Sequence, residues 1–142
     1  MHRIERKIDI ESSPERIFGI VMDPNIISKW NPAVDLAEQR DENLILKTSI
    51  GDLNIINTES EENKYMTIQL EKGNVDSIGY ILTPKKEKTE VMLWSEFDDK
   101  KFIKAYKDVE DLVLKSLKQF SEYLEDGGNP DDYDKKQLLA VP

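Results

Sequence analysis

The sequence contains no cysteine and only one histidine, His2, among its 142 residues. Without cysteine there can be no disulfide bond, no thiolate chemistry and no cysteine-ligated zinc or iron–sulfur site. A single histidine cannot supply a histidine pair to a metal, and we expect His2 to be solvated or to lie at the mouth of a pocket. No nucleophile elbow, P-loop or Gly-rich dinucleotide fingerprint is present. The sequence therefore assigns no catalytic residue, no metal site and no cofactor.

Basic residues are too few to balance the acidic ones, since 20 Lys and Arg face 29 Asp and Glu and leave a net charge of −9. Nucleic-acid-binding proteins normally present a basic face to the phosphates, so we expect no nucleic-acid partner. No apolar run is long enough to cross a bilayer, and residues 1–7 are charged and lack the apolar core of a signal peptide. These features favour a cytoplasmic protein that does not insert into a membrane.

The residues that are present suffice for one hydrophobic core, because 38% are hydrophobic and 142 residues is the usual size of one domain. The composition changes only at Gly127. We therefore predict a domain over residues 1–126 and a polar tail over residues 127–142. The tail ends in the apolar run 138–142, which either stays mobile or docks on the domain or a neighbour, and a homodimer is left open.

The first elements are a strand and two short helices. Residues 4–10 alternate between apolar and charged side chains, as a half-buried strand does. Ser12 and Glu15 have the spacing of a capping box, so a helix should begin here and stop before Pro24. A second short helix is predicted over residues 25–30.

The middle of the chain shows the pattern of strands separated by turns, with no sustained helical period. The six predicted strands are residues 34–40, 44–50, 53–60, 65–72, 77–84 and 90–97. Over residues 99–126 the period becomes helical, and Gly127 suits the left-handed cap that ends such a helix. The apolar face of this predicted helix comprises Phe102, Ala105, Tyr106, Val109, Val113, Leu117, Phe120 and Leu124.

This order of elements resembles that of the START-like (SRPBCC) superfamily. The stretch from Ile8 to Val34, with Trp30 before Asn31-Pro32, looks like the opening of polyketide cyclase/dehydrase-type members, and Thr89-Glu90-Val91 is similar to the entry of their last strand. The resemblance implies an α+β helix-grip fold. In that fold a curved seven-stranded antiparallel sheet wraps a long C-terminal helix, two short helices lie between strands one and two, and an apolar pocket is enclosed.

The superfamily includes carriers of lipids and hormones, coenzyme-Q-binding proteins, aromatase/cyclases and an activator of a heat-shock chaperone. The resemblance thus favours binding of a small, mostly apolar ligand, lipid-like or polycyclic, in an internal cavity. A cyclase or dehydratase-type enzyme using the same cavity is the second hypothesis, and the sequence does not decide between them. A third is a protein-interaction or chaperone-cofactor role through the outer sheet face and the tail.

The candidate ligand contacts are polar or aromatic side chains that fall on inward positions of the predicted elements. An inward arginine on the first strand needs a carboxylate partner or a ligand anion, and the resemblance places the tryptophan at the cavity opening. Each of the other candidates is one polar group among apolar ones, which can orient a ligand or simply be a satisfied core group. The set is Arg6, Trp30, Asn57, Tyr80, Ser95 and Tyr106.

Along residues 90–97, Val91, Leu93, Ser95 and Phe97 share one face of the strand, and Met92, Trp94 and Glu96 share the other. The resemblance favours the Val91 face as the inner one. Met92 and Trp94 would then form a contact patch on the outer face. Among the many carboxylates, Glu59 and Glu96 are the candidates for acid–base work.

Overall fold

Seven strands form one antiparallel sheet in the order β1-β7-β6-β5-β4-β3-β2. In the computed structural model, which describes residues 1–135, strands β2 to β7 form a meander, and β1 pairs with β7 at the other edge. The predicted sheet is confirmed, with strand ends that differ by a few residues. The strands are β1 (His2–Ile10), β2 (Val34–Arg40), β3 (Asn43–Thr48), β4 (Gly51–Glu61), β5 (Tyr65–Glu71), β6 (Ser77–Lys85) and β7 (Lys88–Phe97).

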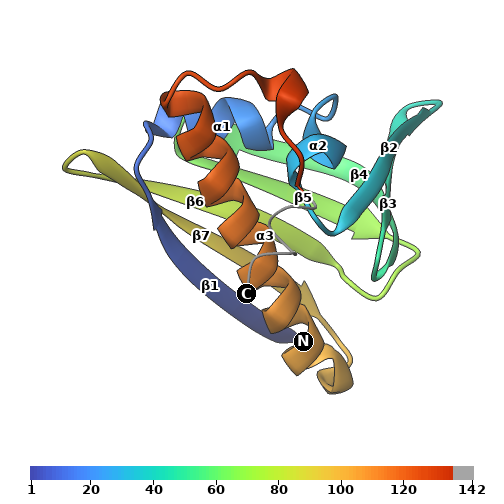
Figure 1. Ribbon diagram of the computed structural model, residues 1–142. Helices are drawn as coiled ribbons and strands as arrows, with labels where there is room; N and C mark the ends of the chain where they lie inside the picture. Colours follow the sequence, from blue (N-terminus) through green and yellow to red (C-terminus); the bar gives the residue numbers. More distant parts are fainter. Residues whose placement is uncertain (136–142) are drawn as a thin grey trace.

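The long helix α3 (Ile103–Glu125) crosses the concave face of this sheet (Figure 1). It follows directly from the 3-10 turn η1 (Lys100–Phe102), so the predicted helix is confirmed. Leu117 and Phe120 are fully buried against the sheet, whereas Ala105, which we placed on the apolar face, is exposed. Gly127, with a φ of +88°, ends the helix as predicted.

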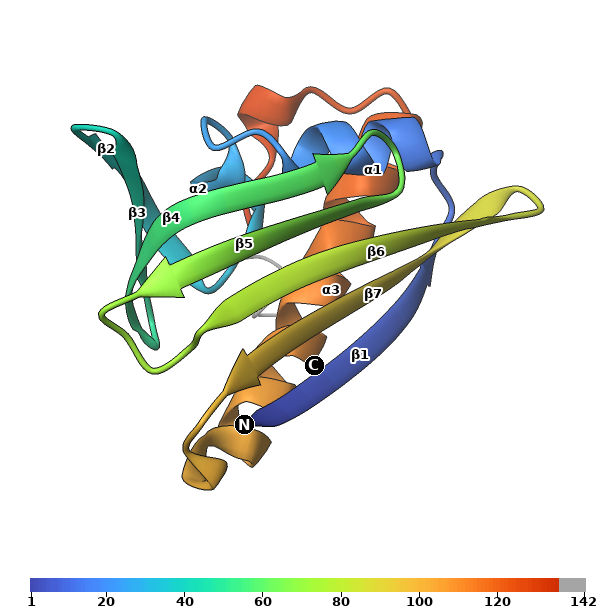
Figure 2. The same cartoon turned by 180° about the vertical axis from the view of Figure 1, so that it is seen from behind.

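Two short helices, α1 (Pro14–Val21) and α2 (Ile27–Trp30), lie between β1 and β2 and cover one end of the concave face (Figure 2). The N-cap of α1 is Ser13, whose hydroxyl accepts a hydrogen bond from the Arg16 amide at 3.2 Å. The prediction that Ser12 caps this helix is wrong. The Ser12 hydroxyl instead donates a hydrogen bond to the Glu125 carboxylate at 2.8 Å. That bond ties the start of α1 to the end of α3.

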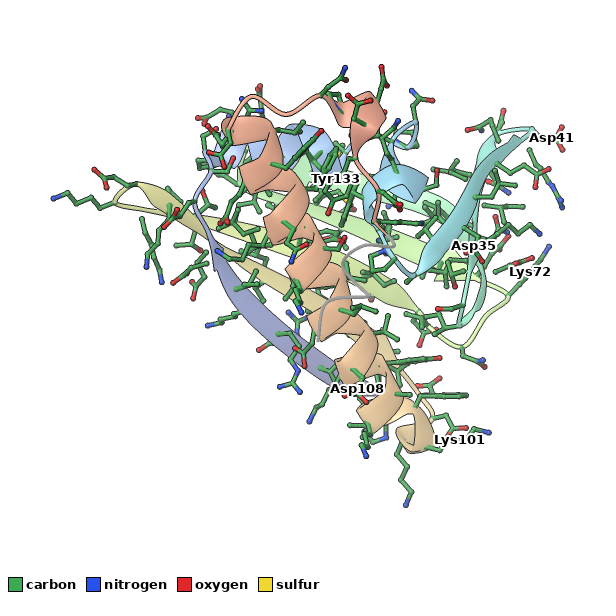
Figure 3. The ribbon with its side chains drawn as sticks, viewed as in Figure 1. Asp35, Asp41, Lys72, Lys101, Asp108 and Tyr133 are labelled. Carbon is green, nitrogen blue, oxygen red and sulfur yellow. The ribbon has the colours of Figure 1, made fainter. Side chains whose placement is uncertain are left out.

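The chain that follows α3 turns back over the short helices. The ring of Tyr133 packs edge-on against Phe120 with 4.8 Å between centroids (Figure 3). The Lys135 ammonium donates to the carbonyl oxygens of Asn31 at 2.9 Å and Val34 at 2.6 Å. The start of the predicted tail therefore packs on the domain, while the apolar run 138–142 lies outside the described residues.

Candidate functional site: an internal cavity beneath the long helix

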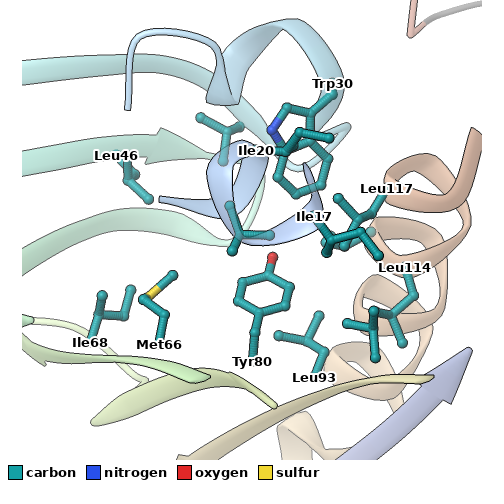
Figure 4. Packing of buried hydrophobic residues seen from close by; sticks show 14 of the residues in the cluster. Ile17, Ile20, Trp30, Leu46, Met66, Ile68, Tyr80, Leu93, Leu114 and Leu117 are labelled. Carbon is teal, nitrogen blue, oxygen red and sulfur yellow. The ribbon is translucent and has the colours of Figure 1, made fainter. Parts of the chain in front are cut away.

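A cavity of about 340 Å³ lies between α3 and the concave face of the sheet. Its wall is built from α1, α2, α3 and strands β2 to β7, and most of its side chains are aliphatic. Figure 4 shows part of this wall, with Met66 and Ile68 on one side, Leu93 below and the short helices above. The strands supply alternate residues to the wall because side chains of a strand point to opposite faces in turn.

Strand β7 shows which face of the sheet is the inner one. Leu93 and Ser95 line the cavity, and Val91 and Phe97 on the same face are completely buried. The predicted orientation of this strand is confirmed. The expected contact patch is wrong for Trp94, because this outer-face side chain is only 8% exposed. The guanidinium of Arg3 covers its ring at 4.2 Å from the centroid.

The polar centre of the cavity is Glu110 on α3. Its side chain lines the cavity and the residue is only 5% exposed. One carboxyl oxygen, Oε2, accepts a hydrogen bond from the Ser95 hydroxyl at 3.0 Å. The other oxygen, Oε1, is buried and has no hydrogen-bond partner among residues 1–135. A buried carboxyl with one free oxygen is thus present in an otherwise apolar wall.

Burial raises the pKa of Glu110 from its ordinary value of 4.5 to about 8. The Ser95 hydrogen bond and the positive charge of Arg6 act in the opposite direction, while the negative charges of Asp111 and Glu5 add to the rise. Desolvation dominates because the charged form of a carboxyl loses its hydration in an apolar site. Glu110 is therefore mainly protonated at neutral pH.

Tyr80 on β6 extends its ring into the space below the short helices, with the hydroxyl pointing toward α1 (Figure 4). The side chain lines the cavity. Burial raises the pKa of Tyr80 above its ordinary value of 10, and the charge of Glu110 adds to this effect. Since a phenol with a raised pKa stays protonated, Tyr80 offers a neutral hydroxyl to the cavity.

Trp30 on α2 closes the wall beside the short helices. It has no exposed surface, and its indole Nε1 is buried without a hydrogen-bond partner among residues 1–135. The Ser116 hydroxyl of α3 donates to the Trp30 carbonyl oxygen, which fixes α2 against the long helix. Trp30 therefore carries a second unpaired polar atom, a donor, which is sealed within the packing beside the cavity.

The structure brings four of the six predicted site residues into the cavity wall, namely Trp30, Tyr80, Ser95 and Tyr106. Burial raises the pKa of Tyr106 as well, and its ring packs edge-on against Phe97 with 4.8 Å between centroids. These four residues come from α2, β6, β7 and α3. The elements meet in space only because the sheet curves around the helix.

The other two predicted residues lie outside the wall. Arg6 forms an ion pair with Asp111 on α3, with 3.3 Å between Nε and Oδ1, so its carboxylate partner is part of the protein. Asn57 follows a β-bulge between Ile55 and Asn57 in β4. Since a bulge reverses the inward and outward alternation, Asn57 is exposed and bonds to Gln69 at 3.3 Å, while Thr58 lines the cavity.

The two carboxylates considered for acid–base work are also outside the cavity. Glu59 on β4 is exposed, and Glu96 on the outer face pairs with Arg3 at 3.0 Å. The carboxylate that does line the cavity, Glu110, was missed. Its signal was available, because Tyr106, Glu110, Val113 and Leu117 follow one another at steps of four, three and four residues along the buried face.

Over the part of the chain that the structure describes, no group of three or more His, Cys, Asp or Glu side chains could hold a metal ion. No helix within residues 1–135 is long and apolar enough to cross a bilayer.

No protein-family model matches the sequence, and a search of curated proteins finds no match. Solved structures do match. XoxI from Bacillus cereus is 18% identical with a TM-score of 0.73, over 88% of this chain and 99% of that one. A START superfamily protein from Mycobacterium smegmatis is 17% identical with a TM-score of 0.71, over 87% and 99%. The Aha1 dimer from Colwellia psychrerythraea is 20% identical with a TM-score of 0.71, over 86% and 97%. The chain therefore has the START-like, helix-grip fold.

Proposed function

We propose that the protein binds one small, mostly apolar molecule, lipid-like or polycyclic, in the internal cavity. The observation that carries this proposal is a pocket of about 340 Å³ beneath the long helix, lined mainly by apolar side chains. A molecule that fills the pocket recovers contacts that the cavity wall lacks.

The size and chemistry of the cavity support the same proposal. Ligand pockets are typically about 300–1,000 Å³, mainly apolar, with a few polar groups that set the orientation of the ligand. Here the apolar wall comes from the sheet and the helices, and the few polar groups include Glu110, Ser95 and Tyr80. The START-like fold supports it too, since the family that the sequence resembles includes carriers of lipids and hormones.

The test is a fluorescence titration with N-phenylnaphthylamine, a neutral apolar dye. We expect saturable binding of about one dye molecule per chain, because a pocket of this size holds one such molecule. Ile78→Phe enlarges a side chain that lines the cavity and should weaken binding strongly. Ile81→Phe, three residues further along the same strand, enlarges a side chain that is 37% exposed and serves as the matched control. Equal binding by both variants, or no saturation, would count against the proposal.

A second candidate, an enzyme of the cyclase or dehydratase kind, is favoured by one observation. Glu110 combines burial in the cavity with a pKa raised to about 8, and a general acid or base works best when its pKa lies near the working pH. Protonated Glu110 would donate its proton to the leaving hydroxyl, which departs as water, and its carboxylate would then accept the proton from the carbon next to the ketone as the C=C bond forms, which restores the acid.

This candidate can be tested with β-hydroxyketones, which lose water to give an enone that absorbs in the ultraviolet. The wild type should accelerate enone formation above the rate in buffer, and Glu110→Gln should not, while both proteins bind the neutral dye. Equal rates for the wild type and buffer would leave only the binding role.

A further inference from the structure

Two buried polar atoms at the cavity lack a partner within residues 1–135: Glu110 Oε1 and Trp30 Nε1. Both side chains line the cavity, and the two residues are 5% and 0% exposed. Buried polar groups in folded proteins are normally hydrogen-bonded, so each exception calls for a physical explanation. A partner supplied by the bound molecule would explain the free oxygen of Glu110, which lies opposite its Ser95 hydrogen bond.

The donor and acceptor properties of the polar groups that line the cavity restrict what that partner can be. A protonated carboxyl and a phenol both donate and accept, so Glu110 and Tyr80 fit an oxygen of either kind. A hydroxyl or carbonyl oxygen on the ligand satisfies these requirements. A purely hydrocarbon ligand would leave the free oxygen of Glu110 unpaired.

The charges around Glu110 restrict the ligand further. The Ser95 hydroxyl on β7 donates a hydrogen bond to Glu110, and the Tyr80 phenol on β6 is close enough to feel its charge. Three charged side chains also influence the pKa of Glu110, namely Arg6 and Glu5 on β1 and Asp111 on α3. Arg6 is already paired with Asp111 at 3.3 Å and is not part of the cavity wall. Among the described residues that line the cavity, Glu110 is the only one with an ionisable acidic or basic group other than tyrosine.

A carboxylate ligand would therefore enter a wall without a counter-ion and would face Glu110. An ammonium ligand would bind well only if Glu110 ionised, and both charges would then lose their hydration in an apolar space. Burial raises the pKa of Glu110 to about 8, which keeps the neutral form dominant near pH 7. A neutral ligand oxygen avoids both costs.

We propose that the cavity selects a neutral apolar molecule bearing a hydroxyl or carbonyl oxygen that bonds to Glu110, in preference to a fatty acid or an alkylamine. The inference rests on the proposed binding function and names the ligand class for the same cavity. It assigns Glu110 the role of the polar contact that chooses among apolar molecules of equal size.

The test is competition between N-phenylnaphthylamine and three molecules with the same chain, namely octanol, octanoate and octylamine, near pH 7. Octanol should displace the dye from the wild type at a concentration about tenfold or more below those needed for octanoate and octylamine. Burying either ligand charge costs hydration that octanol does not lose, and a difference of about 1.4 kcal/mol is already tenfold in affinity. Octylamine displacing the dye best would overturn the inference in favour of an ionised Glu110.

Variants separate the polar contact from the general apolar fit. Glu110→Leu should still bind the dye but lose about tenfold in affinity for octanol. Glu110→Gln, which keeps a neutral donor and acceptor, should retain the preference for octanol. Asp108→Asn, on an exposed position of the same helix, should behave as the wild type does.

The outcomes distinguish this inference from the proposed function. If the wild type fails to bind the dye, the binding function itself fails. If the dye binds but octanol and octanoate displace it equally, or Glu110→Leu keeps the full preference for octanol, then only the inference about the ligand class fails.

Discussion

The stability of the protein should depend on pH through Glu110, and Glu110→Gln should remove this dependence. The native pKa of about 8 lies above the ordinary value of 4.5. Between these two pH values the folded protein holds a proton on Glu110 that the unfolded chain has released. The free energy of unfolding therefore falls as the pH rises through this window and is constant above it. Glutamine has nearly the same shape and no proton to lose.

The magnitude follows from the difference between the two pKa values, 8 minus 4.5 or roughly 3.5, at about 1.4 kcal/mol for each pKa unit. The full difference corresponds to about 5 kcal/mol. If water enters the cavity when Glu110 ionises, the cost falls to about 3 kcal/mol. We expect Glu110→Gln to be more stable than the wild type by about 3 to 5 kcal/mol near pH 9, and to match it within about 1 kcal/mol near pH 4.5.

The assay is urea unfolding followed by circular dichroism at a series of pH values from about 4.5 to 9. The quantity to compare is the difference in free energy of unfolding between the wild type and the variant. Three other carboxyls have lowered pKa values and make the stability of both proteins rise with pH in the acid range, namely Asp9, Glu122 and Glu125. Asp108→Asn, at an exposed position on the same helix (Figure 3), is the control and should follow the wild type. A constant difference between Glu110→Gln and the wild type across this range would refute the reasoning.

Three substitutions test the packing, each measured by urea unfolding. Leu117→Ala removes a fully buried side chain of α3 and should cost about 2–5 kcal/mol; a loss below about 0.5 kcal/mol would show that the helix is not packed on the sheet. Gly79→Ala places a Cβ 2.4 Å from the Trp94 ring and should cost about 1–3 kcal/mol, with a red shift of tryptophan emission; unchanged emission would contradict the covered position of Trp94. Gly127→Ala forces an L-residue to a φ of +88° and should cost about 1–2 kcal/mol; a more stable variant would contradict the left-handed cap.

The fold could be predicted from the sequence because its signals are local. The alternation along residues 90–97 placed Val91, Leu93, Ser95 and Phe97 on one face, and the resemblance identified that face as the inner one. The helical period over residues 99–126 identified the helix that the sheet wraps. These patterns depend on which side chains one element buries, and one element contains that information.

The errors at the site arose where distant parts of the chain meet. Asn57 was misplaced because a β-bulge, which depends on the pairing of β4 with β5, reverses the alternation. Trp94 was expected to be exposed, but Arg3 from the paired strand β1 covers it. Ser12 was taken as a cap, but Glu125, more than a hundred residues later in the sequence, takes its hydroxyl.

Glu110 was missed for a different reason. A charged side chain on a helix is normally solvated, so the ordinary expectation for Glu110 is an exposed position even within an apolar stripe. The structure shows that the carboxyl lies over the cavity, which widens between α3 and the curved sheet, and that Ser95 from β7 meets it there. The sequence pattern could identify Glu110 as buried, but the partner and the void beside it depend on the curvature of the sheet.

The most direct test of the ligand-binding account is a crystal structure of the protein grown with octanol. The account predicts one octanol molecule between α3 and the concave face of the sheet, with its chain against Ile78 and Leu93 and its oxygen within hydrogen-bond distance, about 2.7–3.2 Å, of Glu110 Oε1. An interior filled by side chains, or octanol bound only on the outer face beside Trp94, would contradict it.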